Sequence, residues 1–230
     1  MQPYFFPYIG YFQLMQAVDL FIIHDRVKYV KKGWINRNRI LQNGHDAVIS
    51  LPLKHASDTL DIRDREIAAD FDRERLLNRI NEAYRRARHF AHAFPLIERV
   101  IRHDDGNLFA FLRNSLVETA GYLGIETRVA TASTFAIDPS LKGQDMVIAL
   151  CRGADADVYI NAIGGTELYS AAAFRSAGLE LKFVRSGSFE YRQFGADFVP
   201  WLSIIDVMMF NDADAIRQCL DSNREIFAPS

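Results

Sequence analysis

The first 39 residues constrain the fold more than any other stretch of the sequence. After a loop at residues 2–10, which is rich in proline and aromatic residues, apolar side chains recur at helical spacing from Tyr11 to Val18. The run at residues 20–23 is short and wholly apolar, which is typical of a buried strand in a parallel sheet. The order loop, helix, strand therefore predicts a β-α-β unit.

A β-α-β unit determines where the polar side chains near the start of the chain should gather. In open parallel sheets, ligands bind beyond the carboxyl ends of the strands. Gln2, Tyr4 and Asp25, which follows the apolar run, are therefore expected at one edge, beside the N-terminus of a helix that begins near Gly10. A strand before Gln2 would have no residues in this sequence, so one hypothesis is that the sequence begins a few residues into the fold.

Strand and helix patterns alternate again in the second half of the chain. Residues 127–131, 158–161 and 179–184 have the pattern of strands, and helical periodicity lies between them at 142–153 and 169–177. This alternation predicts an α/β fold. We expect a three-layer, Rossmann-like arrangement with a mainly parallel sheet.

A helical block interrupts the alternation. Residues 72–88, 90–103 and 106–122 each show helical periodicity, so we expect one domain over residues 1–230 with a helical insertion at about 72–123. Before it, the turn signal at residues 42–45 predicts a hairpin.

Composition restricts the classes of partner. The chain is 49% hydrophobic and 24% charged, which is typical of a globular protein, and its net charge of −2 gives no electrostatic case for nucleic acid. Neither a membrane-spanning run nor a signal peptide is present, so we expect a cytoplasmic protein. Cys151 and Cys219 lie far apart and the six histidines lack metal-ligand spacing, so we expect no metal.

Asp25 is the first candidate for chemistry, because it places a carboxylate at the end of a buried strand. As a functional residue it would be a general base or would orient an amine or hydroxyl. The structural alternative is a loop cap, or a partner for Lys28 or Arg39.

The segment at residues 34–39, Trp-Ile-Asn-Arg-Asn-Arg, is the second candidate. Alternation places Asn36 and Asn38 on one face of a strand and Arg37 and Arg39 on the other. Guanidinium and amide groups suit a sugar, nucleotide or phosphopantetheine ligand. The alternative is a solvated edge strand whose charges prevent aggregation.

Three other features favour structural interpretations. Gly164-Gly165 lies between a strand and a helix, as phosphate-binding loops do, but it matches no nucleotide-binding pattern, so a turn is favoured. Cys151 falls on the apolar face of its helix and is expected in the core. Asp206, three residues after Ser203, is expected to cap or pair inside the protein rather than to form a catalytic dyad.

Several motifs together identify a family. They are Met1-Gln-Pro-Tyr-Phe-Phe-Pro-Tyr-Ile-Gly-Tyr-Phe-Gln13, Ile23-His-Asp25, Gly33-Trp-Ile-Asn-Arg-Asn-Arg39, Tyr159-Ile-Asn-Ala-Ile-Gly-Gly165, Tyr191-Arg-Gln193 and Pro200-Trp-Leu-Ser-Ile-Ile-Asp206. They resemble the WbqC-like protein family over nearly the whole chain. Two departures are the absence of the family's usual first strand and the pair Asp25-Arg26, where the family usually has two acidic residues.

The resemblance implies a function. The family is found with bacterial O-antigen and polysaccharide genes, and transfer of glycine or a similar aminoacyl group to an amino sugar has been suggested for it. We therefore expect an amide-forming transferase in which Asp25 orients or deprotonates the amine, and Arg37 and Arg39 hold a phosphate. The expected donor is a thioester of coenzyme A or of an acyl carrier protein, with no resident cofactor, and the expected acceptor is a nucleotide-linked amino sugar.

The expected substrate-binding residues share a position near the carboxyl ends of the predicted strands or within the family motifs. They are Gln2, Tyr4, Tyr11, Lys32, Trp34, Asn36, Arg37, Asn38, Arg39, Asn161, Gly164, Gly165, Tyr169, Tyr191 and Gln193.

Two other functions are open at this point. One is an ATP-dependent adenylating enzyme related to nucleotidyltransferases, although residues 2–10 lack the paired histidines of such enzymes. The other is a non-catalytic binding protein of the polysaccharide assembly machinery, with Tyr4, Phe5, Phe6 and Tyr8 as an adhesive surface.

Overall fold

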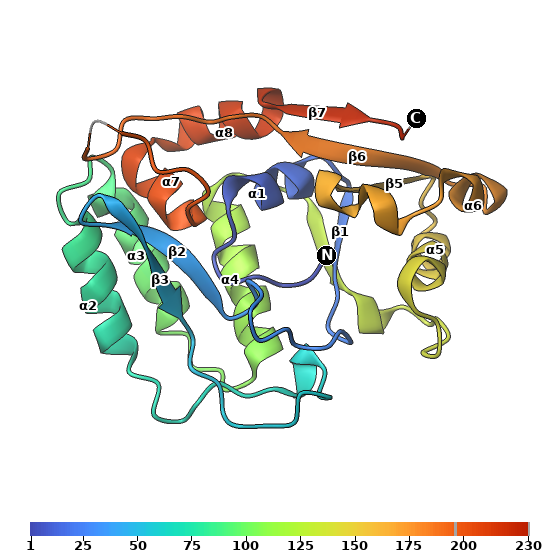
Figure 1. The fold of residues 1–230 in the computed structure, drawn as a ribbon, viewed down its shortest axis with the longest axis horizontal. Coiled ribbons are helices and arrows are strands. Elements are labelled where there is room, and N and C mark those ends of the chain that lie inside the picture. The colour runs from blue at the N-terminus through green and yellow to red at the C-terminus, as the bar shows by residue number, and fades with distance from the viewer. Residues whose placement is uncertain (196, 230) are drawn as a thin grey trace.

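The opening helix and strand form where the sequence predicts them. The computed structural model describes residues 1–195 and 197–229 (Figure 1). Helix α1 (Ile9–Gln16) leads into strand β1 (Leu20–Ile23), which pairs in parallel with β4 (Arg128–Thr131). Phe21 and Ile23 of β1 are buried in the core, whereas Leu20 and Ile22, on the other side of the strand, are only partly buried.

The predicted hairpin is confirmed. Strands β2 (Arg37–Gln42) and β3 (His45–Ser50) pair antiparallel around Asn43 and Gly44, whose φ angles are 54° and 81°. Two consecutive left-handed residues are what a tight turn between twisted strands requires, and asparagine followed by glycine tolerates them best.

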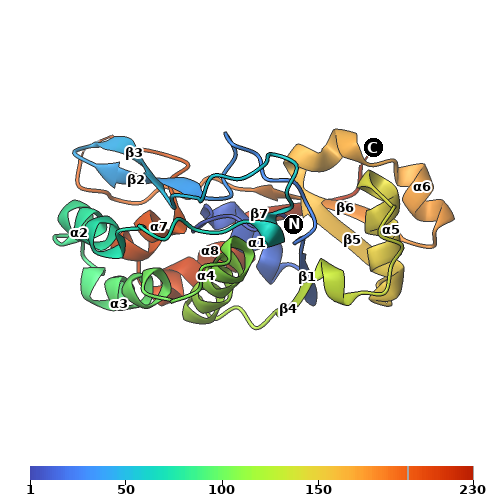
Figure 2. The ribbon, with the colours of Figure 1, turned by 90° about the horizontal axis from the view of Figure 1, so that it is seen from below.

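The helices of residues 73–122 pack together at one end of the molecule (Figure 2). They are α2 (Arg73–Tyr84), α3 (Phe90–Ile101) and α4 (Leu108–Tyr122), preceded by a 3-10 turn, η1 (Ile62–Asp64). Asp72 caps α2 by accepting the backbone N–H of Arg75, and Asn107 caps α4 by accepting that of Ala110. Whether these helices are an insertion in a single domain stays a prediction.

The strand–helix–strand order of residues 158–184 forms a β-α-β unit. No described residue before α1 forms a strand, so the unit predicted at the start of the chain lacks its first strand. Helix α5 (Gly143–Gly153) precedes β5 (Val158–Ala162), and α6 (Ala171–Ser176) connects β5 to the parallel strand β6 (Glu180–Ser186). A 3-10 turn, η3 (Ile163–Leu168), lies between β5 and α6.

The last elements of the chain pack against the helices of residues 73–122 and against the sheet that contains β6. Helices α7 (Ile204–Phe210) and α8 (Ala213–Ser222) follow, and α7 packs against α3. Strand β7 (Arg224–Phe227) pairs antiparallel with β6. The sequence does not predict β7, because its four residues carry no alternating pattern.

The described strands form three small sheets, with the orders β1-β4, β2-β3 and β5-β6-β7. Strands β1 and β5 line the two sides of a groove of about 610 Å³, so the two parallel pairs stay in separate sheets. At this groove, the amide of His24 donates to the carbonyl of Met1 at 2.8 Å. The mixed α/β fold is confirmed, whereas the three-layer, Rossmann-like arrangement stays a prediction.

Two hydrophobic clusters hold the elements in place. The larger one joins the opening segment, α1, the hairpin and the helices of residues 73–122, with Phe5, Phe6 and Phe12 fully buried in it. The smaller one lies around β5 and β6 and includes Phe174 and Phe183. None of the helices in the described residues is long and apolar enough to cross a membrane.

Candidate functional site

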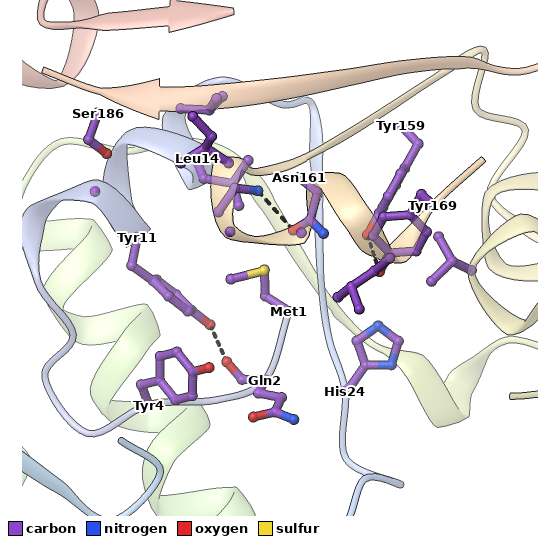
Figure 3. A pocket seen from close by; sticks show the side chains of 18 of the residues that line it. Met1, Gln2, Tyr4, Tyr11, Leu14, His24, Tyr159, Asn161, Tyr169 and Ser186 are labelled. Atoms are coloured by element: carbon purple, nitrogen blue, oxygen red, sulfur yellow. Dashed lines mark hydrogen bonds between the residues drawn. The ribbon is translucent and has the colours of Figure 1, made fainter. Parts of the chain in front are cut away.

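A cavity of about 680 Å³ lies at the carboxyl ends of β1, β5 and β6 (Figure 3). The loop before α1, the start of α1 and the η3 turn also contribute to its wall. This is the edge at which parallel strands present ligand-binding side chains. The cavity is therefore the candidate functional site.

Seven of the predicted substrate-binding residues line this cavity. They are Gln2, Tyr4, Tyr11, Asn161, Gly164, Gly165 and Tyr169. The hydroxyl of Tyr11 donates to the carbonyl oxygen of Gln2 at 3.0 Å, and the rings of Tyr4 and Tyr11 have centroids 5.7 Å apart. These contacts fix the opening loop against α1, so its polar groups are held at the cavity wall.

The two glycines of the η3 turn have different roles. A Cβ atom on Gly165 would lie 2.5 Å from Nδ2 of Asn161, whereas one on Gly164 would meet nothing within 4 Å. Asn161 is buried, and its Oδ1 accepts the backbone N–H of Ala162 at 2.8 Å. Gly165 thus leaves room for the Asn161 amide, which supports the turn interpretation over a phosphate loop.

Six polar or aromatic residues that line the cavity were not among the predicted site residues: Tyr8, His24, Tyr159, Arg185, Ser186 and Trp201. Strand alternation accounts for the position of His24 once the buried side of β1 is known. In β1, Phe21 and Ile23 are buried in the core and Asp25 continues their side, so His24 continues the opposite, cavity-facing side.

Burial controls the protonation of the lining residues. It lowers the pKa of His24 from 6.5 to about 3, so this imidazole is neutral at physiological pH. Burial also raises the pKa of Tyr4, of Tyr8 and of Tyr159, and the hydroxyl of Tyr159 donates to that of Tyr169 at 3.3 Å. These hydroxyls therefore stay protonated and can donate hydrogen bonds.

The wall of the cavity carries little charge. Among the described residues that line it, no side chain is acidic, and Arg185 is the only side chain with a full charge. The Arg185 guanidinium lies 2.7 Å from a carboxylate oxygen of Glu225. The cavity is suited to a neutral or anionic ligand with ring-shaped apolar faces.

Asp25 lies outside this wall. Its side chain is 4% exposed, and Oδ1 accepts the backbone N–H of Ser133 at 3.1 Å. Oδ2 lies 4.0 Å from a guanidinium nitrogen of Arg63, so neither Lys28 nor Arg39 is its ion-pair partner. These contacts join the end of β1 to the segment that follows β4.

The arginines of β2 make contacts within the chain. Arg37 donates to the carbonyls of Gly33 and Lys32, and Arg39 pairs with Asp46 at 3.1 Å. Both guanidiniums lie over the ring of Trp34, 5.7 and 5.4 Å from its centroid. Of this group, Lys32, Trp34, Arg37 and Arg39 do not line the cavity.

The asparagine side chains of the same segment donate hydrogen bonds to backbone carbonyls. Asn38 is buried and its Nδ2 donates to the carbonyls of Phe5 and Phe6 at 3.0 and 2.8 Å. Asn36 accepts from the hydroxyl of Tyr29 at 2.8 Å and donates to the carbonyl of Leu51. Asn36 and Asn38 are therefore also outside the cavity wall.

Tyr191 and Gln193 meet at Asp206 instead of at the cavity. Asp206 is fully buried and accepts hydrogen bonds from Tyr191 at 2.7 Å, Gln193 at 2.8 Å and Tyr84 at 2.7 Å. Burial raises the pKa of Asp206, and the three donors oppose that shift. The cluster agrees with the expectation that Asp206 pairs inside the protein.

The described residues contain no group of three His, Cys, Asp or Glu side chains that could hold a metal ion. Cys151 is buried, and burial raises its pKa to about 11, so it is a protonated core thiol.

Comparison with known proteins agrees with the motifs. Residues 2–218 match the WbqC-like protein family. Rv1507c of Mycobacterium tuberculosis, an uncharacterized protein, is 27% identical over 229 residues, which cover 95% of this chain and 96% of that protein. No solved structure gives a significant match. Because the family match spans most of the sequence, the chain belongs to the WbqC-like protein family.

Proposed function

We propose that this protein is a transferase of bacterial polysaccharide (O-antigen) biosynthesis that joins an acyl or aminoacyl group, such as glycine, to an amino sugar through an amide bond. The observation that supports it most is the cavity, where tyrosine hydroxyls and the Asn161 amide surround a space without acidic side chains among the described lining residues. Tyrosine rings pack against the apolar face of a sugar, and their hydroxyls bond to its polar edge. The reaction takes place in the cytoplasm, where nucleotide-linked sugars and thioesters are available.

The lack of a carboxylate in the described wall favours the reactive form of the acceptor. An ammonium group entering the cavity would leave water without gaining a counter-ion, which lowers its pKa. The amino sugar therefore binds as the free amine, which is the nucleophile that amide formation requires.

The transfer step uses an activated acyl donor, a thioester of coenzyme A or of a carrier protein. The amine nitrogen attacks the thioester carbonyl, the C–N bond forms, and the C–S bond breaks to release the thiolate. The proton that the nitrogen loses passes to the leaving thiolate, which departs as a thiol. His24, which burial keeps neutral, accepts a hydrogen bond from the attacking amine. No nucleophile of the protein and no ATP take part.

In this proposal, two groups of predicted residues support the cavity wall without contacting the substrate. Asp25 is a positioning residue, because its bond to the N–H of Ser133 holds the end of β1 on which His24 stands. Arg37 and Arg39 hold Trp34, and Arg39 also donates to the carbonyl of Trp201 at 3.2 Å. Because Trp201 lines the cavity, the bond from Arg39 to its carbonyl stabilises the cavity wall.

A turnover assay by mass spectrometry tests the proposal. The purified protein is incubated with a panel of nucleotide-linked amino sugars and acyl or aminoacyl thioesters, with and without ATP. We expect one acceptor to gain the mass of one acyl group without ATP. Product that forms only with ATP, with release of AMP and pyrophosphate, would instead establish the adenylating enzyme, and ligand binding without any product would favour the binding protein.

A further inference from the structure

Trp201 has an unusual conformation and an unusual exposure. Its φ angle is 60°, in the left-handed region that bulky side chains rarely occupy, and its side chain is 66% exposed. The left-handed conformation costs about 1–2 kcal/mol for a residue with a side chain. A mostly exposed indole repays little of this cost by packing, so packing does not explain why the ring is exposed.

The backbone at Trp201 and in the residues that follow it is attached to the core. Its carbonyl accepts from Arg39, and the N–H of Ser203 donates to the carbonyl of Arg39 at 2.8 Å. The hydroxyl of Ser203 donates to the carbonyl of Phe6 at 2.7 Å, and the N–H of Ile204 donates to that of Pro7 at 2.9 Å. These bonds join the Trp201 segment to β2 and to the opening loop, so the strained residue is held in a fixed place.

That place is the rim of the cavity. Trp201 is one of its lining residues, and its ring lies 6.0 Å from that of Tyr8, at an interplanar angle of 58°. Tyr8 also lines the cavity. A mostly exposed ring in the wall of a cavity can contact the part of a ligand that protrudes from the interior.

We propose that Trp201 is an aromatic platform on which the base of a nucleotide-linked amino sugar stacks while the sugar occupies the cavity. This inference rests on the proposed function for the identity of the sugar. A planar, uncharged ring system is the ligand chemistry that matches a flat indole face, and such stacking tolerates different bases. Binding energy gained at this remote platform holds the sugar in place for the reaction.

Fluorescence titration tests the platform directly, because the chain has only two tryptophans. In the W34F variant, Trp201 is the sole tryptophan. The probes are UDP-glucosamine, GDP, dTDP, UDP and CMP, with free glucosamine as the ligand that lacks a base. We expect at least one nucleotide to quench the emission of Trp201, and free glucosamine to leave it unchanged.

Two substitutions measure the contribution of the ring to binding. W201A should raise the Kd of the quenching nucleotide at least about five-fold, measured by calorimetry, since stacking on one base contributes about 1–3 kcal/mol. W201F, which keeps an aromatic face, should stay within about three-fold of the wild-type Kd. Equal Kd values for W201A and the wild type, or no quenching by any nucleotide, would overturn the platform.

The experiments can reject the aromatic platform and the proposed transferase activity independently of each other. Quenching and a W201A effect without amide product would keep the platform and reject the transferase. Amide product whose KM is the same in W201A and the wild type would keep the transferase and reject the platform. A change of molecular mass in solution on W201A substitution, measured by light scattering, would show that the ring contacts a second protein chain and would also reject the platform.

Discussion

At the residue scale, the strain at Trp201 has a consequence for stability. Neither W201G nor W201A carries the indole, so the two differ chiefly in how well they tolerate φ of 60°. Glycine adopts this conformation without strain, so W201G should exceed W201A by about 1 kcal/mol in free energy of unfolding, measured by urea denaturation. Equal stabilities would mean that the backbone relaxes when the ring is removed.

His24 makes a second residue-scale prediction. The folded chain keeps its imidazole neutral down to about pH 3, whereas the unfolded chain takes up a proton below about pH 6.5. The unfolded state thus binds more protons between these values, and the free energy of unfolding falls as the pH is lowered from 6.5 towards 3. H24Q should reduce this acid sensitivity in melts recorded across that range. H45Q, at an exposed histidine of the hairpin, is the control that should leave it unchanged.

At the element scale, the η3 turn offers a matched pair of glycines. In G165A the new methyl group would press on the Asn161 amide, so we expect a loss of about 1–3 kcal/mol in free energy of unfolding and weaker ligand binding. In G164A the methyl group meets no atom within 4 Å, and stability should change by less than about 0.5 kcal/mol. Urea denaturation and calorimetric titration measure both effects. Similar losses in the two variants would show that the turn conformation, not the space beside Asn161, is what glycine provides.

Elements with a local sequence signal are predicted correctly, whereas elements that depend on distant contacts are not. The apolar run of β1 and the Asn43-Gly44 turn are local signals, and both gave the correct elements. Strand β7 carries no such signal, because its pairing with β6 comes from contacts distant in the sequence. Asp25 and His24 lie on opposite sides of the chain at the end of β1, and the sequence does not reveal which side faces the cavity.

At the scale of the whole molecule, Tyr84 connects the helices of residues 73–122 to the other elements. Its hydroxyl accepts the N–H of Leu41 in β2 at 2.8 Å and donates to Asp206 in α7 at 2.7 Å. Y84F leaves a buried N–H without a partner and removes one donor from a buried carboxylate, so we expect a loss of about 2–3 kcal/mol in urea denaturation. Y122F, on α4, removes a hydroxyl without a hydrogen bond among the described residues and should change little. A loss as large in Y122F would contradict the role of this connection.

The sequence predicts this global arrangement only in part. Motifs at the start of the chain and around residue 161 led to seven residues of the cavity, because the loop before α1 and the end of β5 meet at the same edge. Tyr191 and Gln193 belong to the same family motifs, yet they serve the buried Asp206. Motifs show that residues matter, but the tertiary fold determines whether they contact a ligand or stabilise the protein.

The measurement that tests the central claim most directly is amide formation by a matched pair of variants, followed by mass spectrometry without ATP. N161A changes the cavity wall, whereas N36A removes an amide outside it. We expect the wild type and N36A to add one acyl group to the nucleotide-linked amino sugar, and N161A to lose most of this activity while it stays folded. Undiminished product from N161A, or no product from the wild type with any acceptor and thioester, would contradict the claim that this cavity is the site of an amide-forming transfer.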